Sequence, residues 1–276
     1  MARFFDAYGE AEWDRHQQSA ASRVGSQVHR AFLVDHVRGG DVVLDAGSGP
    51  GWFTIELARL SAKVHVGDIS PIQLRLNEAH VNEAGCEEAV LGRELLDIRD
   101  LSRFAAATFD GVVCFGGPLS YVRDDADRAL AQLVRVTKPG GYVLLSVMST
   151  LGAMRAFLPT LIGEARTFGP QHAERIFLTG ELERDTNAGH ELRMYRWSQL
   201  AALLERHGEI VSAAAANFLT AGADGARLDA LTADEWERLL SWELRLCREP
   251  GVLDGGTHIL AAIRTPASSG ASPEEE

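Results

Sequence analysis

The chain has 276 residues, enough for one large α/β domain or two small ones and for a buried core without disulfides. Its 39 acidic and 27 basic side chains give a net charge of −12, so we expect neither nucleic acid nor a membrane as a partner. The cysteines Cys86, Cys114 and Cys247 lie far apart without metal-ligand spacing, and no signal peptide or membrane span is evident. We therefore expect a cytoplasmic protein.

Short β-branched runs alternate with amphipathic helical runs, a pattern typical of a parallel sheet covered by helices on both faces. Strands are predicted at 42–45, 64–68, 89–96, 112–115, 142–147, 210–218 and 258–263. Helices are predicted at 52–60, 71–84, 124–136, 198–207 and 232–248. At the start of the second of these helices, we expect a capping box between Ser70 and Gln73.

Two stretches fall outside this alternation and are candidate lids over a ligand. Residues 1–38 are expected to form two helices around a break near 21–25, and they leave open a homo-oligomer built through these helices. Residues 149–197 are rich in aromatic, His and Arg side chains but poorly periodic. The core sheet then comprises residues 39–148 and 198–266, and residues 267–276 should be a disordered tail.

A glycine-rich turn follows the first strand. Gly47, Gly49 and Gly51 allow a ligand to approach the backbone closely at the carboxyl edge of a parallel sheet. The spacing is GxGxG rather than GxGxxG, and Asp45 stands just before it. Because a negative charge there would oppose a pyrophosphate, both features argue against a dinucleotide.

Two further acids stand at the next strand ends. Asp68 ends the second strand, where a carboxylate can accept hydrogen bonds from both hydroxyls of a ribose, and Asp97 ends the third. Three acids and a glycine turn at successive strand ends describe a pocket for a ligand with a ribose and a net positive charge. S-adenosylmethionine fits that description.

The same residues resemble the class I S-adenosylmethionine-dependent methyltransferases. The resemblance covers roughly residues 40 to 147 and rests on VVLDAGSGPG (42–51), VGDISP (66–71), LDI (96–98), FDGVV (109–113) and LVRVTKPGG (133–141). It implies a Rossmann-like, seven-stranded, mostly parallel doubly wound sheet with a reversed last strand. It also implies transfer of a methyl group to an oxygen, nitrogen or carbon nucleophile.

The resemblance implies a cofactor site that can be assigned residue by residue. The residues expected to hold the methionine part and the ribose are Asp45, Gly47, Ser48, Gly49 and Asp68. Those expected around the adenine and the sulfonium are Ile69, Asp97, Ile98, Phe115 and Gly116. Further neighbours on weaker grounds are Gly51, Gln73 and Tyr121.

The acceptor side carries no comparable motif. The residues expected to contact the acceptor, some with aromatic faces toward the sulfonium, are Tyr8, Trp13, Phe115 and His190. A protein base is needed for a protonated amine, a neutral hydroxyl or an unactivated carbon, and the candidates are His190, Tyr195, Tyr8 and His29. Glu243 lies on an apolar helix stripe, and we expect it to pair with His258.

No metal-binding constellation follows the fourth strand, so we expect no metal cofactor. The apolar run 115–119 and the two lids favour a small organic acceptor, of the kind met in secondary metabolism. Two alternatives stay open. One is another reaction on the same cofactor, such as cyclisation, elimination or aminopropyl transfer, and the other is a non-catalytic binding subunit.

Overall fold

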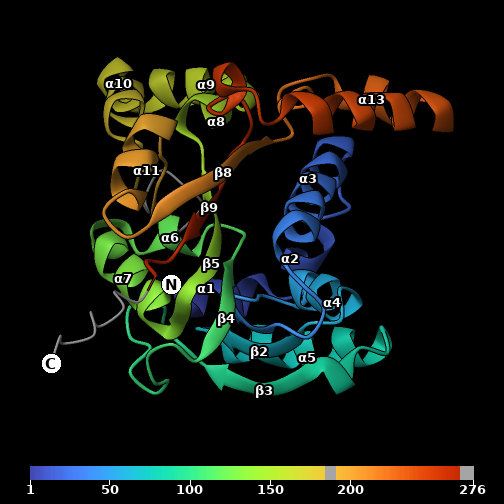
Figure 1. The fold of residues 1–276 in the computed structure, drawn as a ribbon. Helices are drawn as coiled ribbons and strands as arrows, with labels where there is room; N and C mark the ends of the chain where they lie inside the picture. Colours follow the sequence, from blue (N-terminus) through green and yellow to red (C-terminus); the bar gives the residue numbers. More distant parts are fainter. Residues whose placement is uncertain (184–190, 268–276) are drawn as a thin grey trace, which may run out of the picture.

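The computed structural model describes residues 1–183 and 191–267, so His190 and the expected tail from 268 onward lie outside the described residues. Within the described ranges, seven strands form one sheet in the order β3-β2-β1-β4-β5-β9-β8 (Figure 1). These strands are β1 (Val42–Ala46), β2 (Lys63–Asp68), β3 (Val90–Leu95), β4 (Phe109–Cys114), β5 (Thr137–Met148), β8 (Glu209–Ala216) and β9 (His258–Arg264). Strand β9 pairs antiparallel with both neighbours, whereas β1 to β5 pair in parallel. The expected sheet with a reversed last strand is confirmed.

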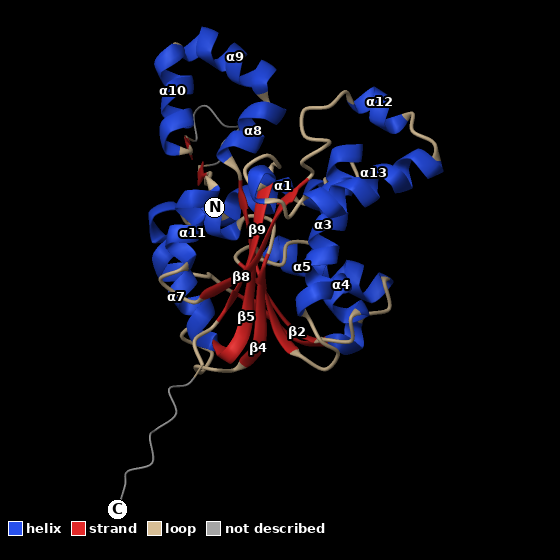
Figure 2. Ribbon diagram, turned by 45° about the horizontal axis from the view of Figure 1, so that its top comes forward, coloured by secondary structure: helices blue, strands red, loops and turns tan. Residues whose placement is uncertain are grey.

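Helices cover both faces of the sheet (Figure 2). They are α1 (Ala2–Tyr8), α2 (Ala11–Asp14), α3 (Ala20–His36), α4 (Trp52–Arg59), α5 (Pro71–Glu83), α6 (Pro118–Tyr121), α7 (Ala126–Val136), α8 (Thr150–Ala156), α9 (Leu158–Phe168), α10 (Pro170–Thr179), α11 (Trp197–Leu204), α12 (Gly225–Asp229) and α13 (Ala233–Leu246). None of the helices in the described part of the chain is long and apolar enough to cross a membrane.

Two apolar cores lie on opposite sides of the sheet. Leu130 of α7 and Leu200 of α11 belong to the first, and Phe32 of α3 belongs to the second with Leu57 of α4. Consecutive residues of β5 divide between them, because successive side chains of a strand point to opposite faces. Burial on both faces explains why these strands are continuous apolar runs rather than alternating ones.

The lid segment after β5 adds a helical layer beyond the carboxyl edge of the sheet. Helices α8, α9 and α10 follow β5 directly, and Figure 2 shows them together at the top of the molecule. Two short strands, β6 (Glu181–Leu182) and β7 (Leu192–Arg193), pair antiparallel as a separate sheet. The expected lid thus contains regular helices and strands, although its sequence shows little helical or strand periodicity.

The N-terminal segment is attached to the start of α5. The Ser70 hydroxyl donates a hydrogen bond of 2.6 Å to Asp6, and Gln73 Nε2 donates to the carbonyl oxygens of Phe5 and Gly9 at 3.0 and 3.1 Å. Ser70 does cap α5 by accepting from the amide of Gln73. The expected capping box is nevertheless wrong, because the Gln73 side chain binds the N-terminal segment instead of the cap backbone.

The break in the N-terminal helices is also placed differently from the expectation. Residues 21–25 lie inside α3, which begins at Ala20, and the break comes earlier, between α2 and α3. Ser19 sets the start of α3, since its hydroxyl oxygen accepts from the amide of Ser22 at 3.1 Å. The N-terminal end of α3 is therefore set by the cap residue Ser19 and not by the glycine at position 25 within the expected break.

Glu243 does not pair with His258. It is fully buried, and its carboxylate accepts hydrogen bonds from the amides of Phe218 and Leu219, just after β8, at 2.6 and 2.8 Å. Burial raises the pKa of Glu243, although these two amides act in the opposite direction. The carboxylate thus connects α13 to the segment just after β8 by accepting from two backbone amides.

We predict that Glu243→Ala strongly destabilises the fold. The substitution removes the fully buried carboxylate that accepts from the half-buried amides of Phe218 and Leu219, so the free energy of unfolding should fall by about 2–4 kcal/mol in urea denaturation. Glu243→Gln should lose less, because its amide oxygen can still accept a hydrogen bond. The control is Glu237→Ala on the exposed face of α13. Equal effects of the alanine variants at 243 and 237 would contradict this role.

Candidate functional site

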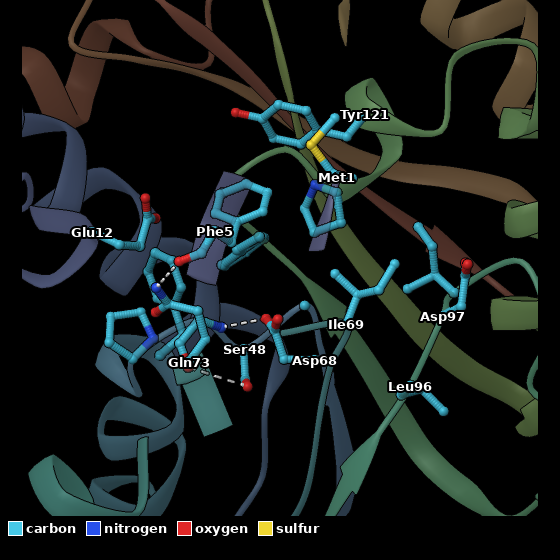
Figure 3. A pocket seen from close by; sticks show the side chains of 18 of the residues that line it. Met1, Phe5, Glu12, Ser48, Asp68, Ile69, Gln73, Leu96, Asp97 and Tyr121 are labelled. Atoms are coloured by element: carbon cyan, nitrogen blue, oxygen red, sulfur yellow. Dashed lines mark hydrogen bonds between the residues drawn. The ribbon is translucent and has the colours of Figure 1, made fainter. Parts of the chain in front are cut away.

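A cavity of about 280 Å³ opens at the carboxyl edge of the sheet (Figure 3). Its walls come from the turn after β1, the ends of β2 and β3, the segment after β4 and the N-terminal segment. Figure 3 shows Glu12 and Asp97 on opposite sides of this cavity, with Asp68 between them. The cavity therefore lies at the edge of the sheet where open α/β folds bind their ligands.

The glycine turn forms one wall. Gly47, Ser48 and Gly49 all line the cavity, and the two glycines have φ of 81° and 51°, which favours glycine. A Cβ on Gly47 would stand 2.4 Å from Pro118, so no side chain fits there. Gly51 does not line the cavity. It precedes α4, where a Cβ would crowd Asn77 of α5 at 3.3 Å, so its role is packing.

Asp68 is the carboxylate at the centre of the cavity wall. One oxygen accepts from the amide of Gly49 at 2.9 Å and the other from the amide of Ser70 at 2.8 Å. Burial raises the pKa of Asp68, while these amides lower it in part. Each carboxylate oxygen has a second lone pair, so the fixed group can also accept two hydroxyl donors. This arrangement fits the two hydroxyls of a ribose.

Asp45 lies beneath the turn rather than in the cavity wall. Its side chain is 1% exposed and accepts a 2.6 Å hydrogen bond from Thr54 of α4, which in turn accepts from Asn77 of α5. Burial raises the pKa of Asp45 to about 7. The structure thus does not bear out direct contact of Asp45 with a methionine part, because the strand directs this side chain toward α4.

The far end of the cavity is lined by Ile69, Leu96, Asp97, Ile98 and Arg99. Arg99 holds the carboxylate of Asp97 at 2.6 Å and also contacts Asp125 at 3.2 Å. Partial burial would raise the pKa of Asp97, but the hydrogen bonds and charge of Arg99 outweigh it and lower the pKa. Leu96 and Arg99 were not predicted, although Arg99 stands only two residues beyond a predicted acid.

Phe115, Gly116, Gln73 and Tyr121 line the cavity near its N-terminal cover, as their assignment to the cofactor site requires. Gly116 is fixed by its amide, which donates to the hydroxyl of Ser146 at 2.9 Å. Burial raises the pKa of Tyr121 to about 12, so this phenol stays protonated. These contacts with a cofactor remain predictions.

Two residues expected to contact the acceptor, Tyr8 and Trp13, and the candidate base Tyr195 do not line the cavity. Tyr8 stacks on Phe4, and Trp13 stacks on His80 at 3.9 Å between ring centroids. Tyr195 lies in the core, where burial raises its pKa to about 12 and its hydroxyl has no hydrogen-bond partner among the described residues. Neither Tyr8 nor Tyr195 is therefore placed in the cavity wall as a base would be.

Three histidines, which we call the histidine group, gather beside Phe115: His16, His29 and His258. His16 lines the cavity, the ring of His29 packs 5.0 Å from that of Phe115, and the His258 ring is 6.0 Å from His29. Burial lowers the pKa to about 2 for His16, 4 for His29 and 3 for His258, and Arg15 lowers each further. All three rings are therefore neutral near pH 7.

The tautomer of His29 follows from its contacts. Nδ1 lies 2.8 Å from the carbonyl oxygen of Gly25, and a carbonyl can only accept, so Nδ1 carries the hydrogen. Nε2 then holds a lone pair, and it has no hydrogen-bond partner among the described residues. His29 is 7% exposed, so this lone pair is available only to a group inside the fold.

Two further charged cavity residues, besides Arg99, were not predicted from the sequence. Glu12 of α2 and Arg15 just after it form an ion pair of 2.6 Å over the cavity. The spacing of acid and base at i and i+3 was the available signal, but it is common on helix surfaces. Within the described ranges, no group of three or more His, Cys, Asp or Glu is arranged to hold a metal ion.

A sheet with a reversed last strand, together with a glycine turn and an acid at the end of the second strand in one cavity, is typical of the class I S-adenosylmethionine-dependent methyltransferase fold. A family model described as a methyltransferase domain matches residues 43–141. Over residues 43–141 the chain is thus similar to the methyltransferase domain, whose members use S-adenosylmethionine as their methyl donor, and its sheet has the class I methyltransferase fold.

Similar proteins include a malonyl-acyl-carrier-protein O-methyltransferase of Erwinia billingiae, 32% identical over 52% of this chain and 52% of that protein. The chain thus spans about half the length of the curated relatives it matches. A Burkholderia thailandensis 1,6-didemethyltoxoflavin-N1-methyltransferase, solved with its acceptor and S-adenosylhomocysteine, aligns with a TM-score of 0.58 at 18% identity over 96% of this chain and 87% of that one. The 4+2 cyclase SpnF aligns with a TM-score of 0.55 at 16% identity over 87% and 81%. At these identities the structures show the fold alone.

We predict that His29 makes stability depend on pH. Its folded pKa of about 4 lies below the ordinary value of 6.5, so its contribution is complete above pH 6.5 and is lost as pH falls toward 4. The stability advantage of the wild type over His29→Gln should shrink by about 2 kcal/mol between pH 7 and pH 5. Urea denaturation of both proteins measures it.

Comparing the wild type with His29→Gln cancels the contributions of other titrating groups to the pH dependence of stability. Asp45, Glu12 and the rest of the histidine group are common to both proteins. Between pH 7 and pH 8 the difference should stay constant, which provides an internal reference. A difference that is also constant between pH 7 and pH 5 would show that His29 is not held neutral by the fold.

Proposed function

We propose that the protein transfers the methyl group of S-adenosylmethionine to an oxygen, nitrogen or carbon nucleophile of a small organic acceptor. The observation that carries the proposal is the position of Asp68, fixed by two amides beside the glycine turn in the wall of the cavity. When bound, S-adenosylmethionine supplies a methyl carbon on a positively charged sulfur, which is a good leaving group. The O-methyltransferase relative supports this reaction class.

The chain contributes orientation and exclusion of water, which together can supply much of the acceleration of such a reaction. Asp68 would hold the ribose, and the backbone of Gly47 and Gly49 would allow close approach of the cofactor. Phe115 and Gly116, after β4, would border the reacting centre. The N-terminal segment covers the cavity and limits access of water, since Gln73 holds it in place.

A small and partly apolar acceptor suits the walls near Phe115. The aromatic side chains of Phe5, Trp52 and Phe53 line the same cavity, and the apolar run after β4 contributes Pro118. The neighbour solved with 1,6-didemethyltoxoflavin has a small acceptor of its own, which supports this class. We infer a role in secondary metabolism on the same grounds.

For a hydroxyl acceptor, we propose His29 as the group that takes the proton. Among the candidate bases that the structure describes, Tyr8, Tyr195 and His29, it is the one with an assigned lone pair and ring contact with a cavity residue, Phe115. The proton would pass from the acceptor oxygen to Nε2 while that oxygen keeps its electron pair for the new bond. An acceptor that is already anionic would need no such base.

The test uses methyl-labelled S-adenosylmethionine with a panel of phenols, amines and indoles. We expect label in one acceptor class and heat of binding with S-adenosylhomocysteine in calorimetry. Asp68→Asn should weaken S-adenosylhomocysteine binding about 10- to 100-fold, because a charge-assisted hydrogen bond pair is lost. Asp100→Asn, the same change at an exposed position, is the control. Binding of a nicotinamide dinucleotide without binding of S-adenosylhomocysteine would refute the proposal.

One observation favours a second reaction type. A solved neighbour with this fold is named a cyclase, so the fold alone does not fix the chemistry. Consumption of S-adenosylmethionine separates the two functions. Methyl transfer consumes one molecule for each product, whereas a cyclisation that keeps the cofactor intact would form product without consuming it.

A further inference from the structure

The Glu12–Arg15 ion pair is a charged feature of the cavity to which the proposed function gives no role. Nε of Arg15 lies 2.6 Å from Glu12 Oε1, and the side chains are 30% and 11% exposed, respectively. Both residues line the cavity. Partly burying two charges is costly, and an ion pair on a cavity wall repays that cost best when a ligand adds further opposite charges.

The two charges stand over different parts of the cavity floor. The Cγ of Glu12 is 3.7 Å from the position that a Cβ on Gly49 would take, so its carboxylate lies above the glycine turn. The Nη2 atom of Arg15 is 3.2 Å from the corresponding position on Gly116, just after β4. Nε of the guanidinium thus contacts Glu12, while its Nη2 end reaches across to Gly116.

This arrangement complements a zwitterion. A cationic group between the glycine turn and Glu12 would be attracted by Glu12 and also by Asp68, whose charge acts on Glu12 in the same region. A carboxylate near Gly116 would find a guanidinium, whose planar fork matches carboxylate geometry. Asp45, the expected partner of the methionine part, is buried beneath the turn and offers no competing site.

We propose that Glu12 and Arg15 bind the α-ammonium and the α-carboxylate of the amino-acid part of S-adenosylmethionine. The proposal rests on the proposed function, because it assigns residues to that cofactor. It also gives α2 a purpose beyond covering the cavity. The N-terminal segment would recognise the zwitterion, while the strand ends recognise the nucleoside.

The experiment compares three ligands that share the nucleoside and differ in the amino-acid part. S-adenosylhomocysteine carries both charges, its decarboxylated analogue carries only the ammonium, and methylthioadenosine carries neither. Binding to the full chain is measured by calorimetry, so no acceptor or turnover is needed. The wild type should bind S-adenosylhomocysteine about 10- to 100-fold more tightly than methylthioadenosine.

Each variant should affect a different set of the three ligands. Arg15→Ala should weaken S-adenosylhomocysteine about 10- to 100-fold and leave both ligands without a carboxylate unchanged. Arg15→Lys keeps the positive charge but loses the planar guanidinium, so its affinity for S-adenosylhomocysteine should lie between those of the wild type and Arg15→Ala. Glu12→Gln should weaken both ligands that carry the ammonium and spare methylthioadenosine. Methylthioadenosine binding also reports folding of each variant, because the nucleoside site must be intact.

Arg99→Ala is the matched control, since it removes a guanidinium from the opposite side of the same cavity. It should change all three affinities by a similar factor. If Arg15→Ala acts like this control, the proposal is overturned and Arg15 serves the acceptor or the fold. A wild type that binds S-adenosylhomocysteine no better than methylthioadenosine overturns it too, while the nucleoside site stands. A wild type that binds none of the ligands ends both this proposal and the proposed function.

Discussion

The rest of the site depends on one carboxylate held at the edge of the sheet. Asp68 accepts from the amide of Gly49 with one oxygen and from that of Ser70 with the other, so it joins the turn after β1 to the start of α5. Ser70 in turn donates to Asp6 in α1. A single group thereby fixes the ligand-facing backbone, the next helix and the N-terminal cover. The resulting shape of the cavity is set before any ligand arrives.

The three acids at successive strand ends differ because their surroundings differ. Asp45 is enclosed by α4 and hydrogen-bonded to Thr54, so burial dominates its pKa and its carboxylate lies outside the cavity wall. Asp97 is partly exposed and held by Arg99, which keeps it ionised. Asp68 lies between these cases, with burial offset in part by amides. The three aspartates, although they stand at equivalent strand ends, therefore differ in exposure, in hydrogen-bond partners and in pKa.

The sheet and the central acid could be predicted because they depend on local signals. Strands buried on both faces are apolar runs, and the turn and Asp68 follow directly from strand ends. The direction of Asp45 could not be predicted, since it depends on how α4 packs. The role of Glu243 depends on amides that precede it by about 25 positions in the chain. Glu12 and Arg15 lie in a segment whose place is set by contacts with α5, which no local pattern encodes.

The position of Arg15 links the two halves of the site electrostatically. Its positive charge lowers the pKa of each member of the histidine group, in addition to the larger effect of burial. If Arg15 binds the carboxylate of the cofactor, its charge is offset, and this contribution to the lowered pKa values weakens. Nε2 of His29 then becomes a stronger base when the methyl donor is in place. The same N-terminal segment would thus close the cofactor site and adjust the proton affinity beside the acceptor, because both depend on one guanidinium.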